Sequence, residues 1–553
     1  MSLQFITGGS GAGKSEYLSR LVCEESVRRP HDNFIVVVPE QYTMETQKKL
    51  VHMHSRKGIL NIDVVSFERL AYKVFEELGG GNRPVLDDTG KNLIVRRVLE
   101  KEKKKLDYFG SSIEKTGFVS ELKSVISELL QYGITPQQLG EIGENVKEKQ
   151  QLSAKLKDIR LVYEEFMAFL STNYITSEEI LDVLCGLVEK SKLIAGSEII
   201  FDGFTGFTPI QYKLMRLLLV YSKGIKISVT IDKKERPTGH EGWNNLFFMS
   251  KEMMNRLIAI CEEEGINVDD TVCVDRDINY RYEGAKDLAY LERNLFRYKG
   301  GVYTGTPENI RIYEGSNPKE ELQYIVSEIL QLTRKEGFRY RDIAVVTADL
   351  ETYGKVAANM MKQNDIPAFL DYKRSVAANP YVEMLCSALE IVEKGYPYDT
   401  MFRYLRTGLT GISRHDIDML ENYCLAVGIR GSRAWHEPWK KKMKRSTYQP
   451  ELETLNALRE QIMAPFLNLE AVLKDKEANV RAYVTAVYEF VTALHSAEQI
   501  KALSECEPAG NEYEQLYAKV LELFDRIVEL LGEENVSLKE FNRIVAAGFE
   551  EMK

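Results

Sequence analysis

The chain has 553 residues, of which 44% are hydrophobic and 28% are charged, and its formal net charge is −10. This composition is that of a soluble globular protein with material for several domains, and no apolar run is long enough to predict a transmembrane span. The acidic balance argues against a protein that binds nucleic acid through its overall charge alone. Seven dispersed cysteines without C-x-x-C spacing, and a Met1 that leads directly into a strand pattern, predict a cytoplasmic protein with reduced thiols and no signal peptide.

The first predicted elements are a short apolar strand over Leu3–Thr7 and a helix over Glu16–Val27, joined by a glycine-rich loop. The loop follows the complete G-x-x-x-x-G-K-[ST] pattern. Its residues are Gly8, Gly9, Ser10, Gly11, Ala12, Gly13, Lys14 and Ser15. In such a loop the backbone N–H groups surround phosphate oxygens, the lysine reaches the β- and γ-phosphates, and the hydroxyl ligates Mg²⁺. We therefore predict that these eight residues bind ATP; a strand–helix turn without a ligand is the weaker alternative.

Further α/β elements follow, and then the pattern changes. Phe34–Val38 is a continuous β-branched run typical of a strand buried on both faces, and Asp63–Phe67 predicts another strand that leads into the helix Glu68–Leu78. From about residue 86 to 190 the apolar residues recur with helical spacing, and few strand signals occur. This stretch predicts a helical insertion.

The α/β pattern resumes with an acid-ended strand. Ser197–Asp202 is predicted as this strand, and Thr208 with Pro209 and Gln211 has the pattern of a helix start with a capping box. Ile225–Ile231 predicts the next strand. Asp202 is the candidate Mg²⁺ ligand beside Ser15, because P-loop enzymes hold the metal with an acid at the end of a second strand. The alternative for Asp202 is an acid that caps the turn before Gly203.

The remaining sequence predicts a second α/β unit and then a mainly helical region. Strands are expected at Ile310–Tyr313, Asp342–Thr347 and Pro367–Leu370, with helices between them. From about residue 380 to the end the pattern is mainly helical. Within it, the stretch 435–445 interleaves two tryptophans with lysines and an arginine. Such a stretch can bind nucleic acid, but we favour a solvated loop whose tryptophans anchor a helical core.

Taken together, these segments resemble the superfamily 1 DNA helicases. More narrowly, they resemble the AddB (RexB-type) component of AddAB helicase–nucleases, the bacterial enzymes that resect DNA double-strand breaks. The resemblance covers most of residues 1–400 and becomes vague beyond them. The matching stretches are Gly8–Ser15, Val38–Tyr42, Ser66–Leu70, Phe201–Thr208, Tyr340–Val346 and Ile366–Asp371.

The resemblance implies an α/β fold with two RecA-like P-loop domains of the superfamily 1 type and large helical insertions. Residues 1–85 and 191–295 would form the first RecA-like domain, which carries the phosphate loop, with 86–190 as a helical insertion. Residues 305–380 would begin the second RecA-like domain, and 381–553 would form a mainly helical insertion domain.

This sequence departs from the motifs of active superfamily 1 motors at three places. The acidic motif D-E-x-Q-D reads Asp202-Gly203-Phe204-Thr205-Gly206 here, so a glycine stands where a glutamate polarises the attacking water. At the spacing of a sensing glutamine after Asp232 stands Glu235, and Ala348-Asp349 stand where an arginine that contacts the γ-phosphate is expected. These departures predict a helicase-shaped protein that binds ATP and Mg²⁺ but does not translocate.

The resemblance also implies partners. In the family, the large AddA-type partner supplies the motor of a heterodimer that acts on double-stranded DNA ends, and the helicase-like region of AddB helps to scan single-stranded DNA for the Chi signal. Family members are about twice as long, with a nuclease domain and an iron–sulfur cluster in their C-terminal half. Nothing in this sequence matches either signature, so no catalytic residue is assigned, and no residue is assigned to DNA contact.

Two other functions remain open from the sequence. The chain can be a competent P-loop ATPase or helicase whose catalytic carboxylate lies elsewhere. Alternatively, it can be a scaffold protein that keeps ATP only to stabilise its fold.

Overall fold

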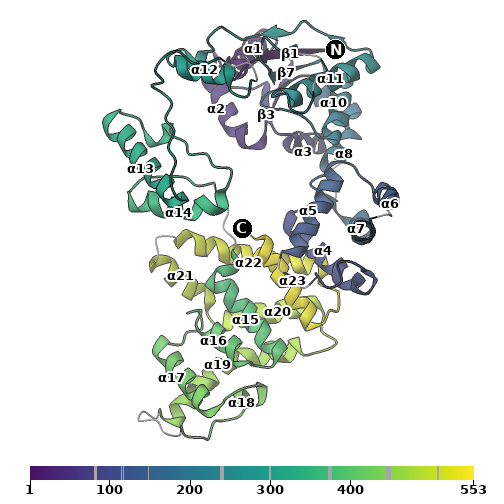
Figure 1. The fold of residues 1–553 in the computed structure, drawn as a ribbon. Coiled ribbons are helices and arrows are strands. Elements are labelled where there is room, and N and C mark those ends of the chain that lie inside the picture. The colour runs from purple at the N-terminus through teal and green to yellow at the C-terminus, as the bar shows by residue number, and fades with distance from the viewer. Residues whose placement is uncertain are drawn as a thin grey trace. The chain divides into compact units, whose positions relative to one another are not determined.

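The computed structural model describes residues 1–553 except 80–83, 114, 116, 147–148, 237–238, 240–241, 298–300, 372–375, 444–449, 507–509 and 553. The chain divides into two compact units, Met1–Gly80 with Leu181–Arg374 and Gly81–Ile180 with Ser375–Lys553 (Figure 1). None of the helices in the described ranges has the length and apolarity needed to cross a bilayer. The expected fold class, α/β with large helical insertions, is confirmed.

The first unit is built on a parallel sheet with the order β3-β2-β6-β7-β1-β8, in which β9 also pairs with β1. Every pairing is parallel. The strands are β1 (Ser2–Gly8), β2 (Asn33–Val37), β3 (Ile62–Val65), β6 (Ser197–Phe201), β7 (Gly224–Thr230), β8 (Asn267–Val268) and β9 (Val272–Cys273). All five residues of β6 and four of the five in β2 are buried, as expected for strands with helices on both faces.

Helices connect and cover these strands, and local signals fix where several of them begin. Ser66 caps one helix by accepting a hydrogen bond from the Arg69 N–H, and Thr208 forms the predicted capping box with Gln211. The helices of this unit are α1 (Lys14–Arg28), α2 (Thr43–Met53), α3 (Phe67–Leu78), α8 (Ile180–Cys185), α9 (Lys192–Ala195), α10 (Pro209–Tyr221), α11 (Phe248–Glu264), α12 (Lys286–Asn294), α13 (Pro318–Lys335) and α14 (Leu350–Gln363). Short 3-10 turns occupy Glu40–Tyr42, Val188–Lys190, Tyr280–Tyr282 and Tyr340–Asp342.

The three strands predicted after residue 305 are wrong for this structure. Residues 310–313, 342–347 and 367–370 form no ladder with any strand in the described part of the chain. A small core joins α13 and α14 instead, with Leu322, Val326 and Met361 among its buried residues. Strand propensity alone does not make a sheet, because each strand needs a neighbour to satisfy its backbone groups.

The second unit is helical, apart from a pair of two-residue strands, β4 (Val85–Leu86) and β5 (Ile175–Thr176). Its helices are α4 (Asp88–Glu102), α5 (Phe118–Gln131), α6 (Pro136–Asn145), α7 (Gln150–Asn173), α15 (Pro380–Lys394), α16 (Tyr398–Leu405), α17 (Arg414–Val427), α18 (Ser432–His436), α19 (Leu452–Leu473), α20 (Val480–Ala493), α21 (Ser496–Cys506), α22 (Gly510–Leu531) and α23 (Leu538–Glu551). Short 3-10 turns occupy Lys103–Lys105 and Val376–Ala378.

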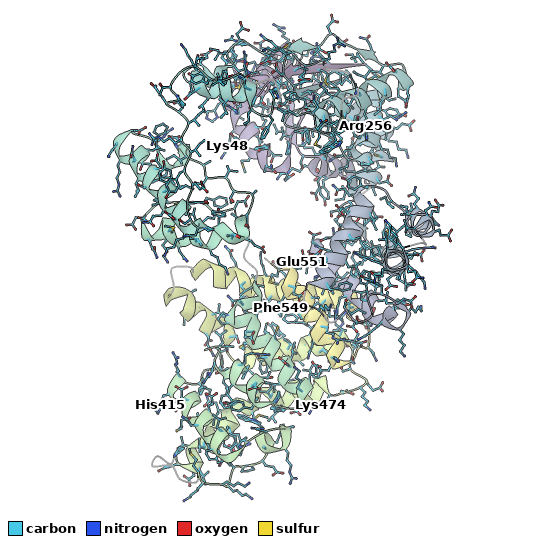
Figure 2. The ribbon with its side chains drawn as sticks, viewed as in Figure 1. Lys48, Arg256, His415, Lys474, Phe549 and Glu551 are labelled. Carbon is cyan, nitrogen blue, oxygen red and sulfur yellow. The ribbon has the colours of Figure 1, made fainter. Side chains whose placement is uncertain are left out.

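The two parts of the second unit share one hydrophobic core, although about 200 residues of chain separate them. Buried Asn92 on α4 donates to the Ala547 carbonyl on α23 at 2.8 Å. Lys123 on α5 pairs with Glu551 at 2.9 Å, and Figure 2 labels Glu551 with Phe549 at the end of α23. The assignment of residues 86–190 and 381–553 as two insertions in RecA-like domains stays a prediction.

Asp287, in the first turn of α12, holds the start of the segment that leads from the sheet to α13. Its carboxylate accepts hydrogen bonds from the backbone N–H groups of Glu308 at 2.9 Å and Asn309 at 2.7 Å, and from the Asn309 side-chain amide at 2.9 Å. These bonds, the one from the Asn309 backbone foremost, lower the pKa of Asp287 to about 2.

We therefore expect the contribution of Asp287 to stability to vanish in acid. Because the pKa is lower in the folded than in the unfolded chain, the contribution is present above about pH 4 and is lost as the pH falls toward 2. Asp287→Asn should lower the thermal midpoint at pH 7, and this difference from the unmodified chain should shrink between pH 4 and 2. Differential scanning fluorimetry of both proteins across this range measures it; a constant difference down to pH 3 would contradict the assignment.

Candidate nucleotide-binding site

The phosphate loop follows β1 directly, at the carboxyl edge of the sheet. Gly11 and Gly13 have φ values of 71° and 94°, the left-handed backbone that side chains with a Cβ rarely adopt. Gly13 is the N-cap of α1, so the helix begins at Lys14 and its N-terminal N–H groups face the loop. This backbone has the concave form that binds anions, and the helix N-terminus adds a partial positive charge.

Lys14 folds back onto the loop. Its ammonium group donates to the carbonyl oxygens of Gly8 at 3.0 Å and Gly9 at 2.9 Å. Burial lowers the pKa of Lys14, and the carboxylates of Asp202 and Asp275 only partly offset this effect. An incoming phosphate would supply the negative charge that this partly desolvated ammonium lacks.

Asp202 lies at the same edge, where β6 ends beside β2. Its N–H donates to the Val37 carbonyl at 3.1 Å, and its carboxylate accepts from the Ser228 hydroxyl at 2.6 Å. Ser15 stands in the first turn of α1 and is exposed. Among the described residues, no three His, Cys, Asp or Glu side chains gather as a metal site. The residues present therefore fit a Mg²⁺ that takes most of its ligands from nucleotide phosphates and water.

The backbone at Gly203 explains why a glutamate does not simply fit there. Gly203 has a φ of 86°, and its N–H donates to the Ser228 hydroxyl at 3.3 Å. A residue with a Cβ in this conformation costs roughly 1–2 kcal/mol, so a glutamate would either strain this turn or change it. The turn that follows Asp202 is thus built around a glycine.

The two other positions where motor motifs were sought have local structural roles. Glu235 pairs with the buried ammonium of Lys251 at 2.6 Å. Asp349 caps α14 by accepting from the Thr352 N–H at 3.0 Å. Neither contact involves the phosphate loop.

The sequence reasoning missed a group of residues that covers the loop. Asn279 donates to the Ser10 carbonyl at 3.3 Å, and the Arg281 N–H donates to the Gly11 carbonyl at 3.4 Å. A Cβ on Gly11 would lie 2.5 Å from the Arg281 Cβ, so this approach requires glycine. The Arg281 guanidinium also reaches the Ser10 hydroxyl at 3.5 Å, which places a second cation beside Lys14.

Tyr280 and two acids complete this layer. The Tyr280 ring lies 3.4 Å from the position of a Cβ on Gly13, and the Arg276 guanidinium stacks on the ring at 3.6 Å. Asp275 and Glu292 approach Gly9 from the same side, and burial raises the pKa of Glu292. No local signal predicts these positions, because β9 is only two residues long and its pairing with β1 is what brings the segment to the loop.

A second surface lies at the carboxyl ends of β2, β3 and β6, and we call it the edge surface: Glu40, Tyr42, Phe67, Arg69 and Phe204. Arg69 pairs with Glu40 at 3.0 Å, and the rings of Phe67 and Phe204 pack with centroids 5.4 Å apart. Tyr42 is 48% exposed. Exposed aromatic rings beside a cation are the groups that bind single-stranded nucleic acid.

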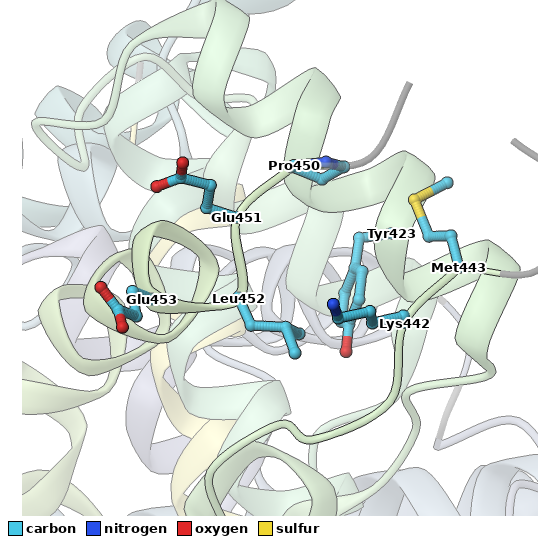
Figure 3. Close-up of a pocket in the computed structure, with 7 residues that line it drawn as sticks. All are labelled: Tyr423, Lys442, Met443, Pro450, Glu451, Leu452 and Glu453. Carbon is cyan, nitrogen blue, oxygen red and sulfur yellow. The ribbon is translucent and has the colours of Figure 1, made fainter. Parts of the chain in front are cut away.

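The tryptophans of the stretch 435–445 are buried, as favoured from the sequence. Trp435 and Trp439 are 1% and 5% exposed, and their rings pack with centroids 5.4 Å apart. Residues 444 and 445 lie outside the described residues. Figure 3 shows a pocket of about 420 Å³ in which Tyr423 and Lys442 face Leu452. Because residues 444–449 join two of its walls, we assign no ligand to this pocket.

A left-handed glycine loop at the carboxyl edge of a parallel sheet, followed by a lysine that opens a helix, defines the P-loop nucleotide-binding class of α/β proteins. A family model described as "ADDB, N-terminal" matches residues 5–292. The chain therefore belongs to the AddB family.

Curated relatives agree with this family. A protein of Lachnoclostridium phytofermentans is 42% identical over 565 residues, which cover 100% of this chain and 49% of the relative. Proteins of Caldanaerobacter subterraneus and Clostridioides difficile are each 34% identical, again across 100% of this chain and 48% and 49% of the relatives. All three are named as the second of the lettered subunits of an ATP-dependent helicase/deoxyribonuclease. The chain spans about half the length of the curated relatives it matches.

Proposed function

We propose that this chain is the N-terminal, helicase-like region of the AddB component in a cytoplasmic ATP-dependent helicase–exonuclease that processes DNA double-strand breaks for recombinational repair. The observation that carries the proposal is the phosphate loop, whose left-handed Gly11 and Gly13 precede Lys14 at the start of α1. The name that the relatives carry supports the same complex. The partner would be a large helicase–nuclease subunit of the AddA type, and the heterodimer would act on double-stranded ends.

In this proposal the loop residues Gly8 to Ser15 bind ATP. Lys14 and Arg281 would neutralise phosphate charge, and Ser15 with Asp202 would hold Mg²⁺. The metal supplies charge neutralisation between the phosphates. No carboxylate follows Asp202, and the turn at Gly203 is built for glycine, which supports a nucleotide site that does not drive translocation.

Single-stranded DNA would bind at the edge surface, in keeping with a role in scanning for Chi. Tyr42 and Phe204 offer ring faces for bases, and Arg69 offers a cation for the backbone. The surface lies on the same sheet edge as the phosphate loop, because all the strands are parallel. The nuclease chemistry and iron–sulfur cluster implied by the family are not assigned to any residue of this chain.

One observation favours a second candidate, a competent ATPase: Arg281 and Asp275 stand beside the loop and are groups that such an enzyme can use. ATP turnover by the chain, with and without single-stranded DNA and with and without a co-expressed large partner, tests both. We expect nucleotide binding without turnover by the chain alone. DNA-stimulated turnover by the isolated chain would overturn motor inactivity and support the second candidate. A thermal midpoint raised by Mg·ATP, together with no binding of DNA in either setting, would reduce the nucleotide to a stabiliser of the fold.

A further inference from the structure

The body formed by α13, α14 and the segments around them leaves apolar side chains open to solvent. Ile312, Val346 and Phe369 are 95%, 92% and 91% exposed, and each stands in one of the three stretches predicted as strands. Every residue from Ala344 to Asp349 is exposed, including the β-branched pair Val345-Val346. Runs of this kind belong inside a sheet, and an uncovered one is an aggregation hazard.

These side chains border a hollow of about 940 Å³. Leu322 and Ile325 of α13 and Met361 of α14 line one side, and Val345, Val346 and Phe369 line another. The buried core of this body is small, because it joins only the two helices and nearby residues such as Ile366. The open face is thus the second side of a layer that already has helices on its first side.

The place where the helical unit closes indicates what covers this face. The N–H of Val376, near the start of Ser375–Lys553, donates to the carbonyl of Met552 near its end, at 3.4 Å. The chain thus enters and leaves this part of the helical unit at one point, as an inserted domain does. Only about five residues separate Asp371 from Val376, a span of at most about 18 Å.

The relatives supply the missing length. They are about twice as long as this chain, and the matched model describes an N-terminal region, so their other half follows it. We propose that residues 310–313, 343–347 and 366–370 are strands of a sheet whose remaining strands come from the polypeptide that follows residue 553 in the full-length protein. This polypeptide starts within about 18 Å of chain from the segment 366–370, so a short connection suffices.

Cysteine accessibility tests the proposal without relying on nucleotide or DNA binding. Val346→Cys and Phe369→Cys are made separately in residues 1–553 and in the full-length protein, and maleimide labelling of each site is followed by peptide mass spectrometry. We expect both sites to react at least tenfold more slowly in the full-length protein. Lys355→Cys, on an exposed position of α14 that does not line the hollow, is the matched control and should react equally in both.

Hydrogen exchange distinguishes strand pairing from simple covering. The backbone amides of residues 344–348 should exchange quickly in residues 1–553 and slowly in the full-length protein. Equal labelling and exchange in both proteins would overturn the proposal. Protection that rises with the concentration of residues 1–553 would identify a second copy as the occupant, and protection that requires the large AddA-type protein would identify that partner; either result would overturn it too.

Discussion

Lys14→Ala is expected to weaken the binding of Mg·ATP at least tenfold. The substitution removes an ammonium that is already partly desolvated and that sits on the carbonyls of Gly8 and Gly9, where phosphate oxygens would arrive. Hydrogen bonds to charged groups contribute about 1.5–3 kcal/mol, and about 1.4 kcal/mol corresponds to a tenfold change in affinity. A titration with a fluorescent ATP analogue in the presence of Mg²⁺ measures the change.

Arg20→Ala provides the matched control for that experiment. Arg20 lies on the same helix, but it is exposed and pairs with Glu16 rather than with the loop. This variant should bind the analogue as the unmodified chain does, since exposed pairs contribute little and the charge is remote from the phosphates. If Lys14→Ala keeps full affinity and a native circular dichroism spectrum, the loop is not the nucleotide site.

Much of the first unit could be predicted because its signals are local. The apolar run Phe34–Val38 predicts a buried strand, and the structure places β2 there within one residue at each end. Thr208, Pro209 and Gln211 predict a helix start at the residue where α10 begins. The P-loop pattern likewise specifies its own conformation, since only glycine takes the φ values at positions 11 and 13 without strain.

The features that were not predicted depend on contacts between distant parts of the sequence. Arg281 meets Gly11 only because β9 pairs with β1, and Asn92 meets Ala547 across the chain. The strand predictions at 310–313, 342–347 and 367–370 fail for the same reason, because a ladder needs partners that the described residues do not supply. Apolar periodicity reports what a segment can become, and the neighbouring chain decides whether it does.

The contrast between Lys14 and Gly203 is consistent with a site that binds more than it turns over. The loop keeps every group that holds a triphosphate, and Arg281 adds a cation to it. At the end of β6, however, the chain turns through a left-handed glycine whose N–H donates to the Ser228 hydroxyl. A water-activating carboxylate at that point would need a different turn as well as a different side chain. The second candidate function therefore requires a base from another element, and Asp275 beside the loop is the one to test.

Phe204→Ala is expected to weaken the binding of single-stranded DNA about tenfold if the edge surface is the binding site. Stacking of a base on an aromatic ring contributes about 1–3 kcal/mol by alanine substitution. Phe204 is partly exposed, and its ring packs on Phe67 at 5.4 Å and Phe207 at 5.5 Å, which holds it in place at the end of β6. Fluorescence anisotropy of a labelled oligonucleotide at fixed salt measures the affinity.

Two further variants separate stacking from charge and from a general loss of aromatic surface. Arg69→Ala should reduce the salt dependence of binding, because a phosphate contact releases counterions, whereas Phe204→Ala should leave the slope unchanged. Tyr488→Ala removes a 56% exposed ring from α20 in the helical unit and should not change the affinity. An unchanged affinity for both Phe204→Ala and Arg69→Ala would move the DNA site away from the carboxyl ends of β2, β3 and β6. Loss in Phe204→Ala together with a lowered thermal midpoint would instead indicate that the ring acts by supporting Phe67, and Phe204→Leu, which keeps apolar bulk but not the ring face, would then restore stability without restoring binding if stacking is the cause.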